Sequence, residues 1–169
     1  MTNMAPMGSD VTKRKHALRE ELVAQLRSTL AGLERAHRIT ADAATHEEAK
    51  PENDKDTRAL EQSYLARGQA NRALEARAAV ALVQAIPTQG FGAEGRVSLG
   101  ALVTVDEQGA STTYWIAPEG GGSRLEGGAV QVVTPKSPLG RALLGKAAGD
   151  TSEVTLGGRV RVLEIMEVA

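Results

Sequence analysis

The spacing of apolar residues changes completely near residue 87, and this change constrains the fold more than any other feature. Before it, the 169-residue chain is rich in alanine, leucine, glutamate and arginine. Gly68 is the one glycine between Leu33 and Gly90. After it, glycine and valine dominate. Helices followed by strands are the simplest interpretation, which predicts an α+β protein built from two parts.

Leucines spaced three or four residues apart mark the first expected helix. They are Leu18, Leu22, Leu26, Leu30 and Leu33. One narrow apolar stripe is typical of a helix that packs against a single partner helix. The stretch 51–84 is the expected partner, with an apolar face of Leu60, Tyr64, Leu65, Leu74, Val80 and Leu82. Residues 10–86 are therefore predicted to form an antiparallel coiled-coil hairpin after a disordered leader at 1–9.

Residues 87–169 carry short apolar stretches separated by glycine-rich turns. The expected strands cover 97–105, 112–117, 129–134, 153–156 and 159–168. One short helix is predicted among them, because Ser137 suits an N-cap, Pro138 the first helical position and Gly145 the residue after the helix. The pattern predicts a small β-rich domain of about 80 residues with one short helix.

Acidic residues gather where the two expected helices meet, around 45–56. The segment 41–56 contains six acids and two lysines, so its formal charge is about −4, whereas the whole chain has −1. The acids are Asp42, Glu47, Glu48, Glu52, Asp54 and Asp56. Carboxylate oxygens suit Mg²⁺, but an open loop cannot enclose the ion. The segment therefore predicts either a Mg²⁺ site that a partner completes, or ordinary solvated charges at helix ends.

Composition excludes several classes of function. The chain has no cysteine, which excludes disulfide frameworks, thiolate zinc sites and cysteine nucleophiles. No apolar run is long enough to span a membrane, so we expect a cytoplasmic protein without membrane contact. Four aromatic residues are too few for a surface that stacks single-stranded bases.

Two sets of residues resemble the GreA/GreB family of bacterial transcript-cleavage factors. Glu52-Asn53, which follows Pro51 and begins a charged helix, is similar to the Asp-x-x-Glu-Asn tip of the family. The segments 100–105, 130–133 and 137–146 resemble its C-terminal signature, in which Ser-Pro precedes a short helix that ends in Gly-Lys. The resemblance extends over residues 10–169.

The resemblance implies an FKBP-like C-terminal domain that grips the rim of the secondary channel of bacterial RNA polymerase. Ser137, Arg141 and Lys146 would belong to the gripping surface. The hairpin would enter the channel, and its tip acids would help to hold a second Mg²⁺ while the polymerase cleaves backtracked RNA.

The expected metal ligands and catalytic candidates all belong to the tip. The ligands are Glu52, Glu48, Asp54 and Asp56, and the catalytic candidates are Glu52, Glu48 and Glu47. The chain would be a cofactor for the endonucleolytic activity of the polymerase and not itself an enzyme. We expect a monomer whose contact with nascent RNA is indirect.

The tip departs from the family pattern at one position. Ala49 stands three residues before Glu52, where the family has aspartate, although Glu47 and Glu48 lie nearby. A second hypothesis is therefore a regulator that binds the secondary channel and inhibits or modulates the polymerase without cleavage. A prolyl isomerase or chaperone is disfavoured by the few aromatic residues, and a generic coiled-coil adaptor is the remaining alternative.

Overall fold

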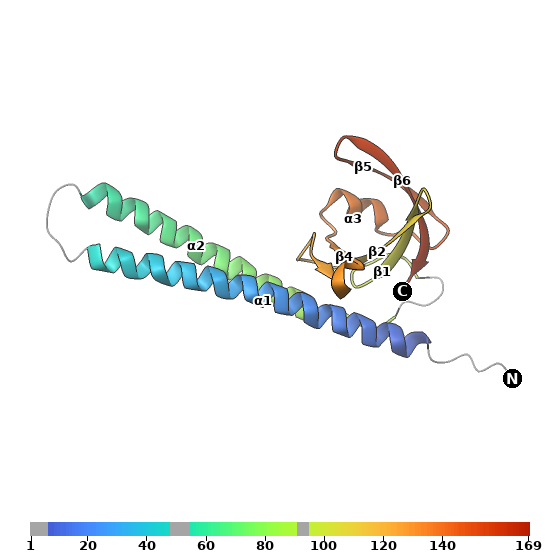
Figure 1. Ribbon diagram of the computed structural model, residues 1–169, viewed down its shortest axis with the longest axis horizontal. Helices are drawn as coiled ribbons and strands as arrows, with labels where there is room; N and C mark the ends of the chain where they lie inside the picture. Colours follow the sequence, from blue (N-terminus) through green and yellow to red (C-terminus); the bar gives the residue numbers. More distant parts are fainter. Residues whose placement is uncertain (1–6, 48–54, 91–94) are drawn as a thin grey trace. The chain divides into compact units, whose positions relative to one another are not determined.

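The computed structural model describes residues 7–47, 55–90 and 95–169 (Figure 1). The chain divides into two compact units. The sheet unit consists of Met1–Val23 together with Leu82–Ala169, and the hairpin unit is Ala24–Ala81. The division after Val23 falls inside a helix, at a place that no change of composition marks.

Two long helices precede all the described strands, which confirms the predicted α+β class. They are α1 (Met7–Glu47) and α2 (Lys55–Gln84). The later elements are β1 (Leu102–Glu107), β2 (Ala110–Ile116), β3 (Arg124–Leu125), η1 (Glu126–Gly128), β4 (Val130–Val133), α3 (Pro138–Leu143), β5 (Thr151–Leu156) and β6 (Arg159–Val168).

The first predicted strand, 97–105, begins too early, since β1 starts at Leu102. A turn precedes it, because the amide of Ala101 donates to the carbonyl oxygen of Ser98 at 3.0 Å. Gly100 adopts a positive φ of 86° in this turn, which an extended strand does not allow. The short strand β3 was not predicted, because two residues are too few to show an alternating pattern.

In the hairpin unit, the segments of α1 and α2 run antiparallel, side by side, and Arg77 forms an ion pair with Glu34 at 2.6 Å (Figure 1). The predicted apolar face of α2 is largely wrong. Val80 is buried, but Tyr64 and Leu74 are 64% and 60% exposed. Ala73, a smaller residue, is buried instead.

The sheet unit contains one six-stranded sheet in the order β3-β4-β2-β1-β6-β5. The pairing of β2 with β4 is parallel, and the other pairings are antiparallel. Side chains alternate between the two faces along each strand. On β2, Tyr114 and Ile116 therefore face one side, while Trp115 faces the other.

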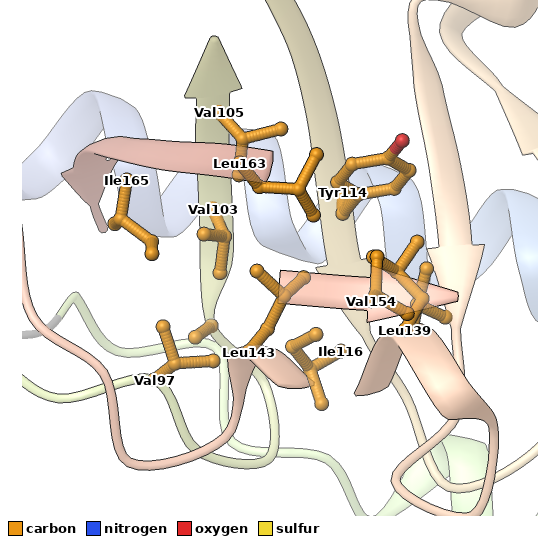
Figure 2. Packing of buried hydrophobic residues seen from close by; sticks show 12 residues of the cluster. Val97, Val103, Val105, Tyr114, Ile116, Leu139, Leu143, Val154, Leu163 and Ile165 are labelled. Carbon is orange, nitrogen blue, oxygen red and sulfur yellow. The ribbon is translucent and has the colours of Figure 1, made fainter. Parts of the chain in front are cut away.

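The first face carries the main core (Figure 2). Its residues are Val97, Ala101, Val103, Val105, Tyr114, Ile116, Val133, Leu139, Leu143, Val154, Leu163 and Ile165. Helix α3 packs against β5 on this side. The buried hydroxyl of Ser152 donates to the carbonyl oxygen of Ala142 at 2.6 Å, so a residue of β5 satisfies a backbone acceptor of α3.

The opposite face is covered in part by the first turns of α1. Leu102 and Trp115 are paired in register on this face and are buried. Leu22 of α1 lies against Gly120, where an added Cβ would be 2.7 Å from its Cδ1 atom. Leu18 and Leu22 have no exposed surface. The leucine stripe predicted for the hairpin thus contributes its first members to the sheet unit.

Polar contacts fix the same turns of α1. Arg14 donates to the carboxylate of Glu126 from both Nε, to Oε1 at 2.9 Å and Oε2 at 3.2 Å, and Nη2, to Oε2 at 2.8 Å. The amide of Glu126 donates to Glu21 Oε2 at 3.0 Å. Hydrogen bonding by Arg14 holds the pKa of the Glu126 carboxyl below its usual value. The backbone amide and the carboxylate of Glu126 are therefore both hydrogen-bonded to residues of α1.

Gly140 provides a test of the packing of α3. A Cβ at this position would lie 2.0 Å from the carbonyl oxygen of Thr134, so the backbone would have to move. We expect Gly140→Ala to lower the free energy of unfolding by about 3 kcal/mol or more. Urea denaturation followed by the fluorescence of Trp115 measures the change within the sheet unit.

The matched control is Gly68→Ala in α2. No atom lies within 4 Å of an added Cβ there. Alanine favours helix, so stability should rise by up to about 1 kcal/mol, measured by circular dichroism at the helix band. A neutral effect of Gly140→Ala would contradict the close approach of α3 to Thr134.

Lys15 predicts a dependence of stability on pH. Its side chain has no exposed surface, and Nζ donates to the carbonyl oxygen of Gln89 at 3.0 Å. Burial lowers the pKa of Lys15 from 10.5 to about 8. Between these values the unfolded chain binds a proton that the folded chain does not, so the free energy of unfolding rises with pH. We expect a gain of about 2 kcal/mol between about pH 7.5 and about pH 9.5.

The variant Lys15→Met should lose this rise, which denaturant titrations at a series of pH values will show. Lys13→Met is the matched control, since Lys13 is an exposed neighbour on the same helix. The series stops below pH 10 because burial raises the pKa of Tyr114, and tyrosine ionisation then favours the unfolded chain. An unchanged slope in Lys15→Met would refute the assignment.

Candidate functional site

The acidic tip lies at the connection between the two long helices. Helix α1 ends at Glu47 and α2 begins at Lys55. The predicted site residues Glu48, Glu52 and Asp54 fall in this connection, which is outside the described residues. Glu47 and Asp56 lie in the ends of the helices, but their side chains are also outside the described part. The predicted roles of these acids therefore remain predictions.

The described residues hold no other candidate for the predicted Mg²⁺. Within 7–47, 55–90 and 95–169, no group of three or more acidic, histidine or cysteine side chains could bind a metal ion. The donor set of the tip consists of carboxylate oxygens, which suit Mg²⁺. Ala49 contributes no donor, so the chain offers one carboxylate fewer than the family pattern at this position.

The segment around α3 contains the predicted partner-binding residues. Ser137 caps α3, because its Oγ accepts from the amide of Gly140 at 3.0 Å and donates to the carbonyl oxygen of Thr134 at 2.8 Å. These internal bonds explain Ser137 as a structural residue, as expected for an N-cap. Its predicted role in binding a partner stays a prediction.

Basic side chains surround the end of α3. Arg141 is exposed, and Lys146 is half-buried. The carbonyl oxygen of Lys146 accepts from the amide of Val97 at 2.8 Å. Arg96 Nη1 donates to the carbonyl oxygen of Gly145 at 3.0 Å. The structure thus brings Arg96 to the backbone of the residue before Lys146, although Arg96 lies 45 residues or more before the predicted residues Arg141 and Lys146 in the sequence.

A groove flanks α3. Its volume is 390 Å³, and it is lined by Leu82, Val97, Ser98, Leu99, Pro118, Glu119, Pro135, Lys136 and Leu144. Leu82 and Leu99 are 50% and 40% exposed. Exposed leucines in a groove with charged residues beside them are typical of a protein-binding surface. We call this surface the α3 groove.

The residues of the α3 groove were missed by sequence reasoning. Leu82 falls near the end of α2, where leucine spacing predicts burial in the hairpin. Leu99 and Lys136 belong to separate loops, and neither carries a local signal. A groove assembled from five distant segments depends on tertiary structure, so no pattern within one segment can show it.

The described residues were compared with the length and hydrophobicity that a membrane-spanning helix needs. Neither long helix contains a window apolar enough to cross a lipid bilayer. The charged residues spread along α1 and α2 explain this result.

Comparison with known proteins identifies relatives. A family model described as "Transcription elongation factor, GreA/GreB, C-term" matches residues 92–169. Transcription elongation factor GreA of Alkalilimnicola ehrlichii is 34% identical over 155 residues, which cover 89% of this chain and 90% of the relative. GreA of Ralstonia nicotianae is 32% identical over 99 residues, or 57% of this chain, and the match spans 60% of that relative.

Solved structures include the GreA factor homolog 1 (Gfh1) protein of Thermus thermophilus. It is 18% identical, with a TM-score of 0.39 over 90% of this chain and 95% of that chain. The sequence match to the Alkalilimnicola relative spans both helices and the sheet unit. With one third of the residues identical over nearly its whole length, the chain belongs to the GreA/GreB family of transcription elongation factors.

Proposed function

We propose that the chain acts on bacterial RNA polymerase through its secondary channel and stimulates Mg²⁺-dependent cleavage of backtracked RNA by the polymerase. One observation carries the proposal. In a chain of this family, the acids Glu48, Glu52 and Asp54 fall between the last residue of α1 and the first residue of α2. Carboxylates at such a connection can reach a metal ion held by another protein.

The tip residues would act as ligands. Glu52, Glu48 and Glu47 would present carboxylate oxygens to an Mg²⁺ that the polymerase also binds, with Asp54 and Asp56 adding negative charge. When bound, the ion would activate water and stabilise the leaving oxygen. The chain would position oxygens, and the polymerase would supply the remaining catalytic groups. On this proposal the chain is a cofactor of its partner and not an enzyme.

A second candidate function is favoured by Ala49. A regulator that occupies the channel without promoting cleavage requires the hairpin and the docking surface but not a complete ligand set. Ala49 removes a carboxylate at the family's aspartate position. Reaction rates fall steeply when a catalytic group is displaced by about 1 Å, so Glu48 one residue earlier is no simple replacement.

The α3 groove is the proposed docking surface for the polymerase. Leu82 and Leu99 provide exposed apolar area, and Lys136 and Glu119 provide charge within the groove, while the predicted residues Arg141 and Lys146 are close in sequence to its lining residue Leu144. Apolar contact supplies affinity, whereas the charges guide the encounter. Docking and cleavage would therefore depend on separate residues.

Replacing the tip glutamate separates these roles. We expect Glu52→Gln to reduce cleavage in a stalled, backtracked elongation complex by at least about tenfold, because a ligand oxygen loses its charge. Polymerase affinity should change less than about twofold, because docking is proposed to use the α3 groove and not the tip. Transcript shortening on a gel and competition binding measure the two effects. Equal losses in both would make Glu52 a docking residue.

Restoring the family acid tests the second candidate. We expect Ala49→Asp to raise the cleavage rate by at least about threefold, because it supplies the missing carboxylate.

The earlier variant Glu52→Gln has a matched control in Asp42→Asn, since Asp42 is an exposed acid in α1. If neither the natural chain nor Ala49→Asp shortens RNA while polymerase is bound, cleavage stimulation is wrong.

The groove is tested by Leu99→Ser. We expect a loss of polymerase affinity of about fivefold or more, because an apolar side chain no longer enters the interface. Val160→Ser is the matched control, since Val160 is 67% exposed and belongs to β6, outside the groove. Equal affinity of Leu99→Ser and the natural chain would exclude the groove as the docking surface.

A further inference from the structure

Exposed apolar residues of the sheet unit fall into two groups among the described residues. Leu82 and Leu99 line the α3 groove. The second group is Val160, Val162 and Met166, which are 67%, 53% and 54% exposed. All three belong to β6. Such a row is unusual on the surface of a small domain and is typical of an interaction site.

The row lies on the face of the sheet opposite the main core. Leu163 and Ile165 of β6 point into the core beside α3. Side chains alternate along a strand, so Val162 and Glu164 face the other side, whereas Met166 lies at the register shift between β6 and β1, where the alternation is interrupted. This is also the side of Trp115, where Leu22 of α1 covers the sheet. Helix α1 therefore covers one part of this face and leaves β6 and the edge strand β5 open.

The open part of this face carries negative charge. Val162 is paired in register with Glu153 of β5, and Glu164 is paired with Thr151. Glu153 and Glu164 are both exposed. Arg161 alternates with Val162 and forms an ion pair with Glu107, and with Arg159 it lines a pocket beside Val160 at the end of the β5–β6 hairpin. The surface thus carries Val160, Val162 and Met166, with Glu164 between the last two and Glu153 beside Val162 on β5.

The charge decides between possible occupants. Anionic lipid would be repelled by Glu153 and Glu164. A second copy that used the same face would bring these carboxylates against their equivalents, which disfavours a symmetric dimer. A protein helix with an apolar stripe flanked by lysine or arginine satisfies both the apolar row and the acids. The row from Val160 to Met166 spans about 20 Å, which matches roughly 13 helical residues.

We propose that the open face of β5 and β6 binds a basic amphipathic helix of a partner protein, which lies beside α1 and completes the helical layer on this side of the sheet. The site lies on the opposite face from the main core and shares no residue with the α3 groove. The proposal is independent of RNA cleavage.

The experiment uses the full chain and a fluorescent designed peptide of about 18 residues, whose leucine stripe is flanked by lysines. Fluorescence anisotropy measures its affinity at low salt. We expect the double variant Val162→Ser/Met166→Ser to weaken binding at least about fivefold, and Glu153→Gln/Glu164→Gln to do the same. All four positions are exposed, and thermal melting confirms that the variants fold.

Matched controls identify the site that the peptide uses. Leu99→Ser in the α3 groove and Glu52→Gln at the tip should leave the affinity unchanged. A peptide of the same composition in scrambled order should bind at least about fivefold more weakly, because its stripe is lost. Binding that depends on Glu52 or Leu99, or that ignores the β6 variants, would overturn the proposal. Self-association of the natural chain that Val162→Ser/Met166→Ser abolishes, measured by sedimentation, would also overturn it.

The test is separable from that of the proposed function. Polymerase affinity and transcript cleavage report on Leu99, Ala49 and Glu52. Peptide affinity reports on Val162, Met166 and the two flanking acids. Loss of one set of effects leaves the other set measurable.

Discussion

The burial of the first turns of α1 is the constraint on which the rest of the structure depends. Leu18 and Leu22 are fully buried in the sheet unit, and Leu22 lies against Gly120. Around them, Arg14 binds Glu126 through Nε and Nη2, and Arg19 Nη1 donates to the carbonyl oxygen of Ile86 at 3.2 Å. The apolar contacts supply most of the stabilisation, because exposed ion pairs contribute about 1 kcal/mol or less.

The burial of Lys15 makes an unfavourable contribution to the stability of this interface. Its ammonium group is removed from water, and one described hydrogen bond runs from Nζ to the backbone of Gln89. Removal of a charge from water is unfavourable, which is why the pKa of Lys15 falls to about 8. The surrounding leucines must therefore offset this penalty.

Local signals predicted those parts of the fold that local interactions determine. The strand 159–168 coincides with β6, and the cap at Ser137 is confirmed, because alternation and capping involve neighbours in sequence. The face of α2 was predicted wrongly. Tyr64 and Leu74 are the larger apolar residues, but the contact uses Ala73 and Val80. Residue size alone therefore does not decide burial, because the side of a helix that faces its partner is set by tertiary structure.

The candidate sites divide in the same way. The acidic tip was recognisable because its charge is concentrated within one segment of the sequence. The α3 groove was not, since Leu82, Leu99 and Lys136 meet through tertiary structure. The row on β6 could be predicted from the sequence in part. Alternation shows that Val160 and Val162 share a face, but only the position of α1 shows that this face is left open.

Charge and geometry make separate contributions at the tip. The segment 41–56 keeps a formal charge of about −4 despite Ala49, so its general attraction for cations is retained. Attraction of this kind acts over about 10 Å and tolerates displacement of a single carboxylate. Metal ligation does not tolerate such a displacement, because Mg²⁺ requires oxygen ligands in near-octahedral geometry at about 2 Å. On the proposed function, Ala49 would therefore affect the chemical step and leave the encounter with the polymerase largely intact.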